Sequence, residues 1–158
     1  MQFSKWHGLG NDYLLVERAD LTVPLTPERV RRICDYHFGV GSDGILEVVS
    51  VNGAEAEVVI WNPDGSTAEL SGNGTRIAAR WLARRSGEDA VRIRVGPREV
   101  AAHLQGGREV ELDVGEVEVS APETLAVGTR VGLDSSVRST PDATSIVRTD
   151  QVVDRRLT

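Results

Sequence analysis

The sequence has few cysteine and aromatic residues, no excess of basic residues and no long apolar run. A single cysteine, Cys34, excludes an internal disulfide and is typical of a reducing compartment, so we expect a cytoplasmic protein. The net charge of −6 argues against a nucleic-acid partner, because nucleic-acid-binding domains usually carry a basic face. No apolar stretch approaches the roughly 20 residues of a membrane-spanning helix, and the first residues lack the apolar core of a signal peptide. We therefore expect neither nucleic acid nor a membrane as partner.

Aromatic residues are also unevenly placed, and none lies beyond Trp81. From Ser120 onward the chain is rich in serine and threonine with scattered apolar residues, a composition that orders poorly. The total of 158 residues, 40% of them hydrophobic, is ordinary for one globular domain. These features predict a folded domain at residues 1–119 and a separate tail at residues 120–158.

Alternating apolar residues and turn signals predict that the domain is mostly β. The predicted strands cover residues 2–7, 12–18, 45–51, 55–61, 91–95, 100–104, 110–114 and 117–119. Gly8-Leu9-Gly10-Asn11 between the first two strands favours a hairpin-like reversal. Gly106-Gly107 favours a turn between the strands at 100–104 and 110–114.

Two further segments have helical spacing. The first helix is predicted to begin after Thr26 as N-cap, with Pro27 in its first turn and apolar positions that continue to His37 or Phe38. The second is predicted at residues 75–85, and Gly87 is a suitable C-cap. Small residues on the second helix indicate close packing against a sheet. The pattern as a whole predicts an α+β fold.

The strongest functional signal is Ser71-Gly72-Asn73-Gly74, which opens directly into the second helix. Glycines at a helix N-terminus let a ligand approach unpaired N–H groups, where the helix dipole favours an anion. The loops at 8–11 and 62–66 could converge on the same place, and Asn11 and Asn62 each offer an amide donor and an acceptor. Together these groups could hold the carboxylate and ammonium of an amino acid. The alternative is that the Asn and Gly residues only form turns.

Other polar residues carry weaker signals. His7 precedes a glycine turn and could be catalytic, but a structural role at a strand end is favoured. Cys34 lies on the apolar face of a helix and is interpreted as a small core residue. Asp43, between glycines, is expected to cap a turn or orient a loop. A solvated helix face, or a surface for an acidic partner, is expected from Arg80, Arg84 and Arg85.

Four motifs, in this order along the chain, resemble the N-terminal half of diaminopimelate epimerase. They are residues 6–12 (Trp-His-Gly-Leu-Gly-Asn-Asp), 39–44 (Gly-Val-Gly-Ser-Asp-Gly), 62–66 (Asn-Pro-Asp-Gly-Ser) and 71–76 (Ser-Gly-Asn-Gly-Thr-Arg). The resemblance covers about residues 1–119. It implies two pseudo-symmetric domains, each a curled, mainly antiparallel β-sheet around a central helix, with the substrate between them.

The same resemblance implies a cofactor-independent isomerase. The family interconverts LL- and meso-diaminopimelate for lysine and peptidoglycan synthesis, with neither pyridoxal phosphate nor a metal. One cysteine from each domain takes part: one thiolate removes the α-proton, and the other thiol delivers a proton to the opposite face. By position, Asn11 and Asn62 match substrate-binding residues, and Gly72 and Asn73 match the backbone groups that hold the reacting carboxylate. A homodimer is also compatible with the resemblance.

The chain departs from the family pattern in two ways. Ser71 stands where the family has its first catalytic cysteine, and the second domain with its own cysteine is not found. A thiol ordinarily titrates near ~8.5, whereas an aliphatic hydroxyl is closer to water, at about 15.7. The gap corresponds to roughly 10 kcal/mol in forming the basic anion, and a helix dipole offsets only about 1–2 kcal/mol of it. Ser71 alone is therefore expected to be a poor base.

Two classes of function follow from these observations. The leading interpretation is an epimerase family member, truncated or divergent, with little activity of its own. The alternative is a non-catalytic carboxylate-binding or assembly module that pairs with a homologous chain. A different isomerase of the same fold is a third interpretation, but the Gly-Leu-Gly-Asn-Asp motif argues against it. On either leading view, residues 120–158 are a remnant of the second domain or a disordered tail.

Overall fold

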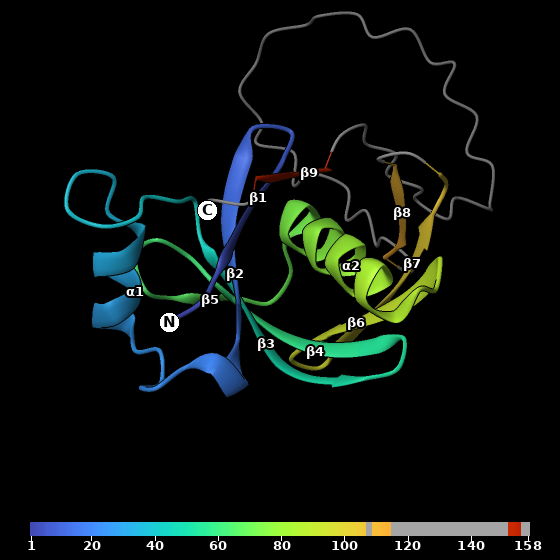
Figure 1. Cartoon of the computed structure of the whole chain (residues 1–158), viewed down its shortest axis with the longest axis horizontal. Helices are drawn as coiled ribbons and strands as arrows, with labels where there is room; N and C mark the ends of the chain where they lie inside the picture. The colour runs from blue at the N-terminus through green and yellow to red at the C-terminus, as the bar shows by residue number, and fades with distance from the viewer. Residues whose placement is uncertain (107–108, 115–151, 156–158) are drawn as a thin grey trace, which may run out of the picture.

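A computed structural model describes residues 1–106 and 109–114 and the backbone of residues 152–155 (Figure 1). The strands are β1 (Ser4–Gly8), β2 (Asn11–Glu17), β3 (Ile45–Asn52), β4 (Glu55–Trp61), β5 (Thr67–Ala68), β6 (Ala90–Val95), β7 (Arg98–Leu104), β8 (Val110–Asp113) and β9 (Val152–Arg155). The helices are α1 (Pro27–Cys34), α2 (Gly72–Ser86) and the short 3-10 helix η1 (Arg18–Asp20). The strands predicted within residues 1–114 are all present, with bounds that agree to within two residues.

The strands form one mixed sheet in the order β8-β7-β6-β4-β3-β2-β1-β9, and β5 pairs with β4 at the side of this path. The β2–β3 and β4–β6 pairs are parallel, and the other pairs are antiparallel. Figure 1 shows the sheet curling around α2, with α1 on the other side of the sheet. The predicted α+β fold, a curled and mainly antiparallel sheet around a central helix, is confirmed.

Helix α2 fills the concave face of the sheet and forms the main core. Ile77 and Leu82 of α2 are fully buried against sheet residues such as Leu46 and Ile93. Each buried side chain of this size contributes roughly 1.5–3 kcal/mol relative to an exposed one. The predicted C-cap is confirmed, because Gly87 has a left-handed φ of 79°. The helix begins three residues earlier than expected, at Gly72, because the side chain of Ser71 caps it.

Helix α1 covers the outer face of the sheet and forms a second, smaller core. Its N-cap is Thr26, as expected, with the Arg29 N–H donating to Thr26 Oγ1 at 3.4 Å. The expected continuation to His37 or Phe38 is wrong, because α1 ends at Cys34 and Phe38 is 95% exposed. The carboxylate of Asp35 explains this end: it accepts the N–H groups of His37 and Phe38, both at 2.8 Å, and so turns the chain.

The β1–β2 hairpin carries the Gly8–Asn11 loop at its tip. Gly8 and Asn11 are paired, and Leu9 and Gly10 between them have φ values of 54° and 90°. Two successive left-handed residues make the I′-type turn whose twist suits a hairpin, so the predicted reversal is confirmed.

Some sequence predictions concern residues beyond the described ranges. The predicted strand at 117–119 lies outside the described residues, and so does Gly107 of the predicted Gly106-Gly107 turn. The domain boundary near residue 119 also falls there and stays a prediction. Within the predicted tail, β9 pairs antiparallel with β1. None of the helices in the described ranges has the length and apolar character needed to span a membrane.

Candidate active site

Ser71 caps the N-terminus of α2 and sits beside its first free N–H groups. Its backbone is extended (φ −136°, ψ 117°), and its Oγ accepts the Gly74 N–H at 3.1 Å. The N–H groups of Gly72 and Asn73 belong to the first helical turn, where α-helix geometry offers no carbonyl partner. Gly72 is exposed and Asn73 half-buried. The predicted anion cradle is therefore open to a ligand.

The first turn of α2 packs tightly against the sheet at Gly74. A Cβ there would lie 3.0 Å from Leu46 Cδ2 and 3.3 Å from Ser71 Oγ. Gly74 thus lets the first turn of α2 approach β3 closely while its N–H holds the side chain of Ser71.

Tyr13, on β2, lies directly against Ser71 and was not singled out from the sequence. Its side chain is 5% exposed, and its Oη lies 3.1 Å from Ser71 Oγ. The ring packs against Gly44, where a Cβ would come within 2.7 Å of Tyr13 Cε1. The alternation of β2 could have placed Tyr13 on the face of the sheet that packs against α2. Its contact with Ser71 depends on the tertiary fold.

The β1–β2 hairpin lies beside the N-terminus of α2 (residues 71–74, the helix mouth), in agreement with the predicted convergence of the loops. A Cβ at Gly8 would lie 3.9 Å from both Cβ and O of Asn73. Asn11, paired with Gly8, is exposed near this contact. The structure therefore brings the loop that carries Asn11 to Asn73.

The Asn62 turn is held differently from the other two loops. Asn62 Nδ2 donates to Ser66 Oγ at 2.9 Å, and the Gly65 N–H donates to Asn62 O at 2.9 Å. Gly65, with φ of 84°, packs against Pro27 of α1. Within the described residues, no hydrogen bond joins Asn62 to Ser71. The side-chain amide of Asn62 thus donates within its own turn. The neighbouring residue, Trp61, is connected to Ser71 indirectly: its carbonyl packs against Gly44, which also contacts the ring of Tyr13.

Arg76 adds a buried positive charge close to the helix mouth. Its side chain is 4% exposed, and it donates to Asn73 Oδ1. Its Nη1 lies 3.5 Å from the position of a Cβ at Gly72. Burial lowers the pKa of the Arg76 guanidinium, and in the described part of the chain no carboxylate pairs with it. Both the helix dipole and Arg76 therefore favour an anion at Gly72 and Asn73.

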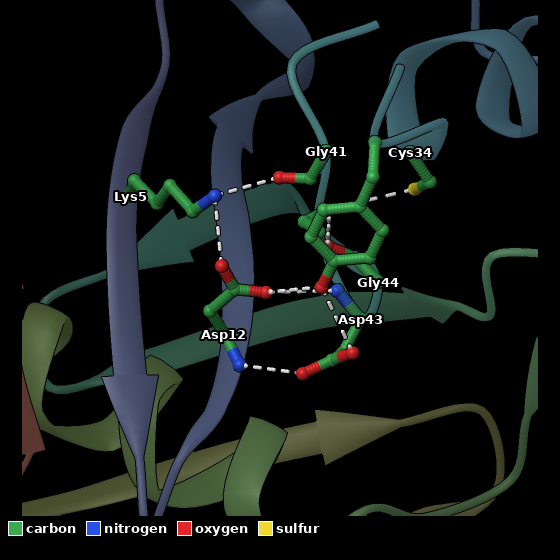
Figure 2. Close-up of polar contacts among 8 residues, drawn as sticks. Lys5, Asp12, Cys34, Gly41, Asp43 and Gly44 are labelled. Atoms are coloured by element: carbon green, nitrogen blue, oxygen red, sulfur yellow. Dashed lines mark hydrogen bonds and ion pairs between the residues drawn. The ribbon is translucent and has the colours of Figure 1, made fainter.

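A polar network ties the hairpin to the glycine-rich loop at 39–44 (Figure 2). The carboxylates of Asp12 and Asp43 each accept the N–H of the other residue, at 3.0 Å and 2.9 Å. Lys5 Nζ pairs with Asp12 at 2.7 Å and donates to Gly41 O at 2.7 Å. Partial burial raises the pKa of the Asp12 carboxyl, but Lys5 and the Asp43 N–H outweigh this and lower it. Asp43 orients a loop, as expected.

The remaining sequence candidates lie in structural surroundings. Cys34 is 3% exposed, and burial raises the pKa of its thiol, so the interpretation as a core residue is confirmed. His7 is half-buried on β1, opposite Asp12. Of the expected solvated arginine face, Arg84 and Arg85 are exposed and Arg80 is half-buried, and Arg84 lies over the ring of Trp6. Among the described residues, no cluster of three or more His, Cys, Asp or Glu is arranged to hold a metal ion.

Comparison with known proteins shows that the family model of diaminopimelate epimerase matches residues 3–120 of this chain. The chain is 38% identical over 128 residues to the chloroplastic diaminopimelate epimerase of Oryza sativa subsp. japonica, covering 78% of this chain and 36% of that protein. It is 39% identical over 133 residues to diaminopimelate epimerase of Synechocystis sp. (80% and 48% covered), and 35% identical over 143 residues to that of Corynebacterium glutamicum (82% and 52% covered). The chain thus spans about half, or less, of the length of these relatives.

Solved structures agree on the fold. A predicted epimerase from Pseudomonas aeruginosa matches with a TM-score of 0.55 at 14% identity, over 70% of this chain and 42% of that one. A hydroxyproline epimerase from Agrobacterium vitis matches with a TM-score of 0.52 at 14% identity, over 72% and 41%. At such low identity, these likenesses show the shared fold alone.

Proposed function

Because the chain belongs to the diaminopimelate epimerase family, we propose that it forms the N-terminal half of the substrate site of such an epimerase. The reaction would interconvert LL- and meso-diaminopimelate by two-base proton transfer, in lysine and peptidoglycan synthesis in the cytoplasm. The observation that carries the proposal is the N-terminus of α2, where Ser71 caps the helix, the first N–H groups have no helical partner and the buried Arg76 lies close to Gly72.

In this proposal the reacting carboxylate lies on the N–H groups of Gly72 and Asn73. The helix dipole and the charge of Arg76 stabilise it there, and they also stabilise the negative charge that builds on the carboxylate when the α-proton leaves. Asn11 and Asn62 contact the rest of the substrate. Asn62 must then exchange its bond to Ser66 for one to the ligand.

Ser71 limits the chemistry that this half-site can do alone. In the proposal it occupies the position of one of the two acid–base groups, facing the α-carbon. An aliphatic hydroxyl lies about 7 pK units above a thiol, which corresponds to roughly 10 kcal/mol in forming the anion. We therefore propose that the activity of this chain is low or nil.

Hydrogen exchange in deuterated buffer tests the proposal. LL-diaminopimelate is incubated with the chain, with the chain plus the C-terminal half of the Synechocystis relative, and with the Ser71→Cys variant plus that half. Deuterium at the α-carbon is measured by mass spectrometry, with Ser71→Ala as the matched background. We expect exchange to rise from the first mixture to the third. If the third mixture matches Ser71→Ala and the chain does not bind the substrate in calorimetry, the proposal is wrong.

The second candidate function is a carboxylate-binding or assembly module without catalysis, pairing with a second copy or a homologous chain. It is favoured by the engagement of Ser71 Oγ, which holds the Gly74 N–H and contacts Tyr13. A module of this kind binds diaminopimelate but gives no exchange with serine or with cysteine at position 71. The exchange experiment above therefore separates the two functions.

A further inference from the structure

In the described part of the chain, the hydroxyl of Ser71 has two hydrogen-bond partners, and helix capping explains only one of them. Gly74 N donates to Ser71 Oγ at 3.1 Å, which is the ordinary bond of a serine N-cap. Tyr13 Oη lies at the same distance of 3.1 Å on a different element, β2. Among the described residues, Ser71 is the hydrogen-bond partner of the Tyr13 hydroxyl, which is part-buried at this contact.

The direction of this second bond follows from the chemistry of the two hydroxyls. A serine oxygen has one proton to donate and two lone pairs, and Gly74 uses one lone pair. A phenol is a stronger acid than an aliphatic alcohol, so it is the better donor of the pair. With the Tyr13 proton on its second lone pair, Ser71 Oγ has both acceptor positions filled. Its own proton then points away from both donors.

We propose that Tyr13 is a positioning residue that acts through Ser71. Its phenol donates to Ser71 Oγ, turns the serine proton toward the ligand at Gly72 and Asn73, and stabilises negative charge on the atom at position 71. This proposal rests on the proposed function, because it takes the mouth of α2 as the ligand site. In the reaction, the atom at position 71 gains or loses only the α-proton, and Tyr13 keeps its own.

Gly44 and the core keep Tyr13 in place for this role. The Tyr13 ring passes so close to Gly44 that a Cβ there would lie 2.7 Å from Cε1 and 3.1 Å from Cδ1. Tyr13 as a whole is only 5% exposed, so its hydroxyl is held at a fixed position beside Ser71. A hydroxyl held in this way needs little reorientation when negative charge forms beside it. Donors that are already oriented in this manner stabilise such a charge without a cost of reorganisation.

A thiol at position 71 gives a test that needs neither substrate nor activity. In the Ser71→Cys variant, the pH dependence of alkylation by iodoacetamide reports the pKa of the introduced thiol. Adding Tyr13→Phe removes only the phenolic oxygen, and we expect it to raise that pKa by about one pH unit, the value of one hydrogen bond to a charged group. Peptide mapping separates the introduced thiol from the buried Cys34.

Tyr36→Phe, also in the Ser71→Cys background, is the matched control. The Tyr36 hydroxyl contacts Asp12 and Asp43 and not Ser71, so we expect no change in the pKa of the thiol. Melting temperatures of all variants check that the fold is kept. If Tyr13→Phe leaves the pKa of the introduced thiol within 0.2 of the value with tyrosine (about a quarter of a kcal/mol), the inference is overturned.

A double-mutant cycle on the serine chain is the second test. Binding of LL-diaminopimelate is measured by calorimetry for the chain, Tyr13→Phe, Ser71→Ala and the double variant. We expect Tyr13→Phe to weaken binding about fivefold when Ser71 is present and not at all in the Ser71→Ala background. Equal losses in both backgrounds would overturn the inference. If the unchanged chain does not bind diaminopimelate and the complemented Ser71→Cys mixture exchanges no faster than Ser71→Ala, the proposed function fails, whereas the thiol titration still decides the role of Tyr13.

Discussion

Replacing Gly44 by alanine should destabilise the fold and disturb the candidate site together. The added Cβ would lie 2.5 Å from Trp61 O and 2.7 Å from Tyr13 Cε1, whereas ordinary contacts lie at 3.4–4 Å. Neither neighbour can retreat easily. Trp61 is paired with Ile45 between β3 and β4, and the Tyr13 ring is buried in the main core. Overpacking of this kind typically costs about 1–3 kcal/mol.

The assay is urea unfolding of Gly44→Ala, with Gly8→Ala as the matched control. Both glycines are buried at strand ends with φ outside the left-handed region, but a Cβ at Gly8 meets atoms only at 3.9 Å. The control should be neutral or more stable by about 0.4–1 kcal/mol, since alanine restricts the unfolded chain. We expect Gly44→Ala to be less stable than the control by at least about 1 kcal/mol. Equal midpoints for the two variants would refute the steric reasoning.

Three further variants test the cap of α2 and the polar network of Asp12 and Asp43. Ser71→Ala removes the N-cap of α2 and should lower the free energy of unfolding by about 1 kcal/mol in urea titrations. The pKa of Asp12 is lower in the folded chain than the value of 3.8 expected for the unfolded chain, so the ionised carboxylate stabilises the fold at pH values above 3.8. This contribution is lost as the pH falls through the folded pKa. Asp12→Asn should therefore be less stable at pH 7 and show a flatter loss of stability below about pH 4. Desolvation of the hydroxyl and its bonds to Asp43 and Asp12 raise the pKa of Tyr36 to about 12, and Asp43→Asn should lower that pKa in an ultraviolet titration.

Local chemistry explains which parts of the fold could be predicted from the sequence. The caps at Thr26 and Gly87 and the Leu9-Gly10 reversal depend on neighbouring residues alone, and the structure confirms each of them. The end of α1 was missed because apolar spacing continued to Phe38, while the Asp35 carboxylate offered the backbone a competing turn. Hydrophobic periodicity does not reveal a polar side chain that competes with the helix for backbone N–H groups.

The candidate site was predictable only where it is contiguous in the chain. The motif at 71–74 contains its own cap and its own free N–H groups, so the hypothesis of an anion site there could be drawn from the sequence alone. Tyr13 reaches Ser71 across 58 positions of sequence, and Arg84 reaches Trp6 in the same way. Such contacts are set by strand order and by glycines such as Gly44 that let a ring pass. Residue types at single positions do not specify them.

Serine at position 71 combines two properties that oppose each other. As an N-cap it is among the best residues, and its bond to the Gly74 N–H contributes about 1 kcal/mol to α2. As a base it is weaker than a thiol by roughly 10 kcal/mol in forming the anion. If Tyr13 stabilises charge at this position, it offsets only about 1.5–3 kcal/mol of that difference. Ser71→Cys should therefore make the chain slightly less stable and a much stronger proton acceptor, so melting temperature and exchange rate should move in opposite directions.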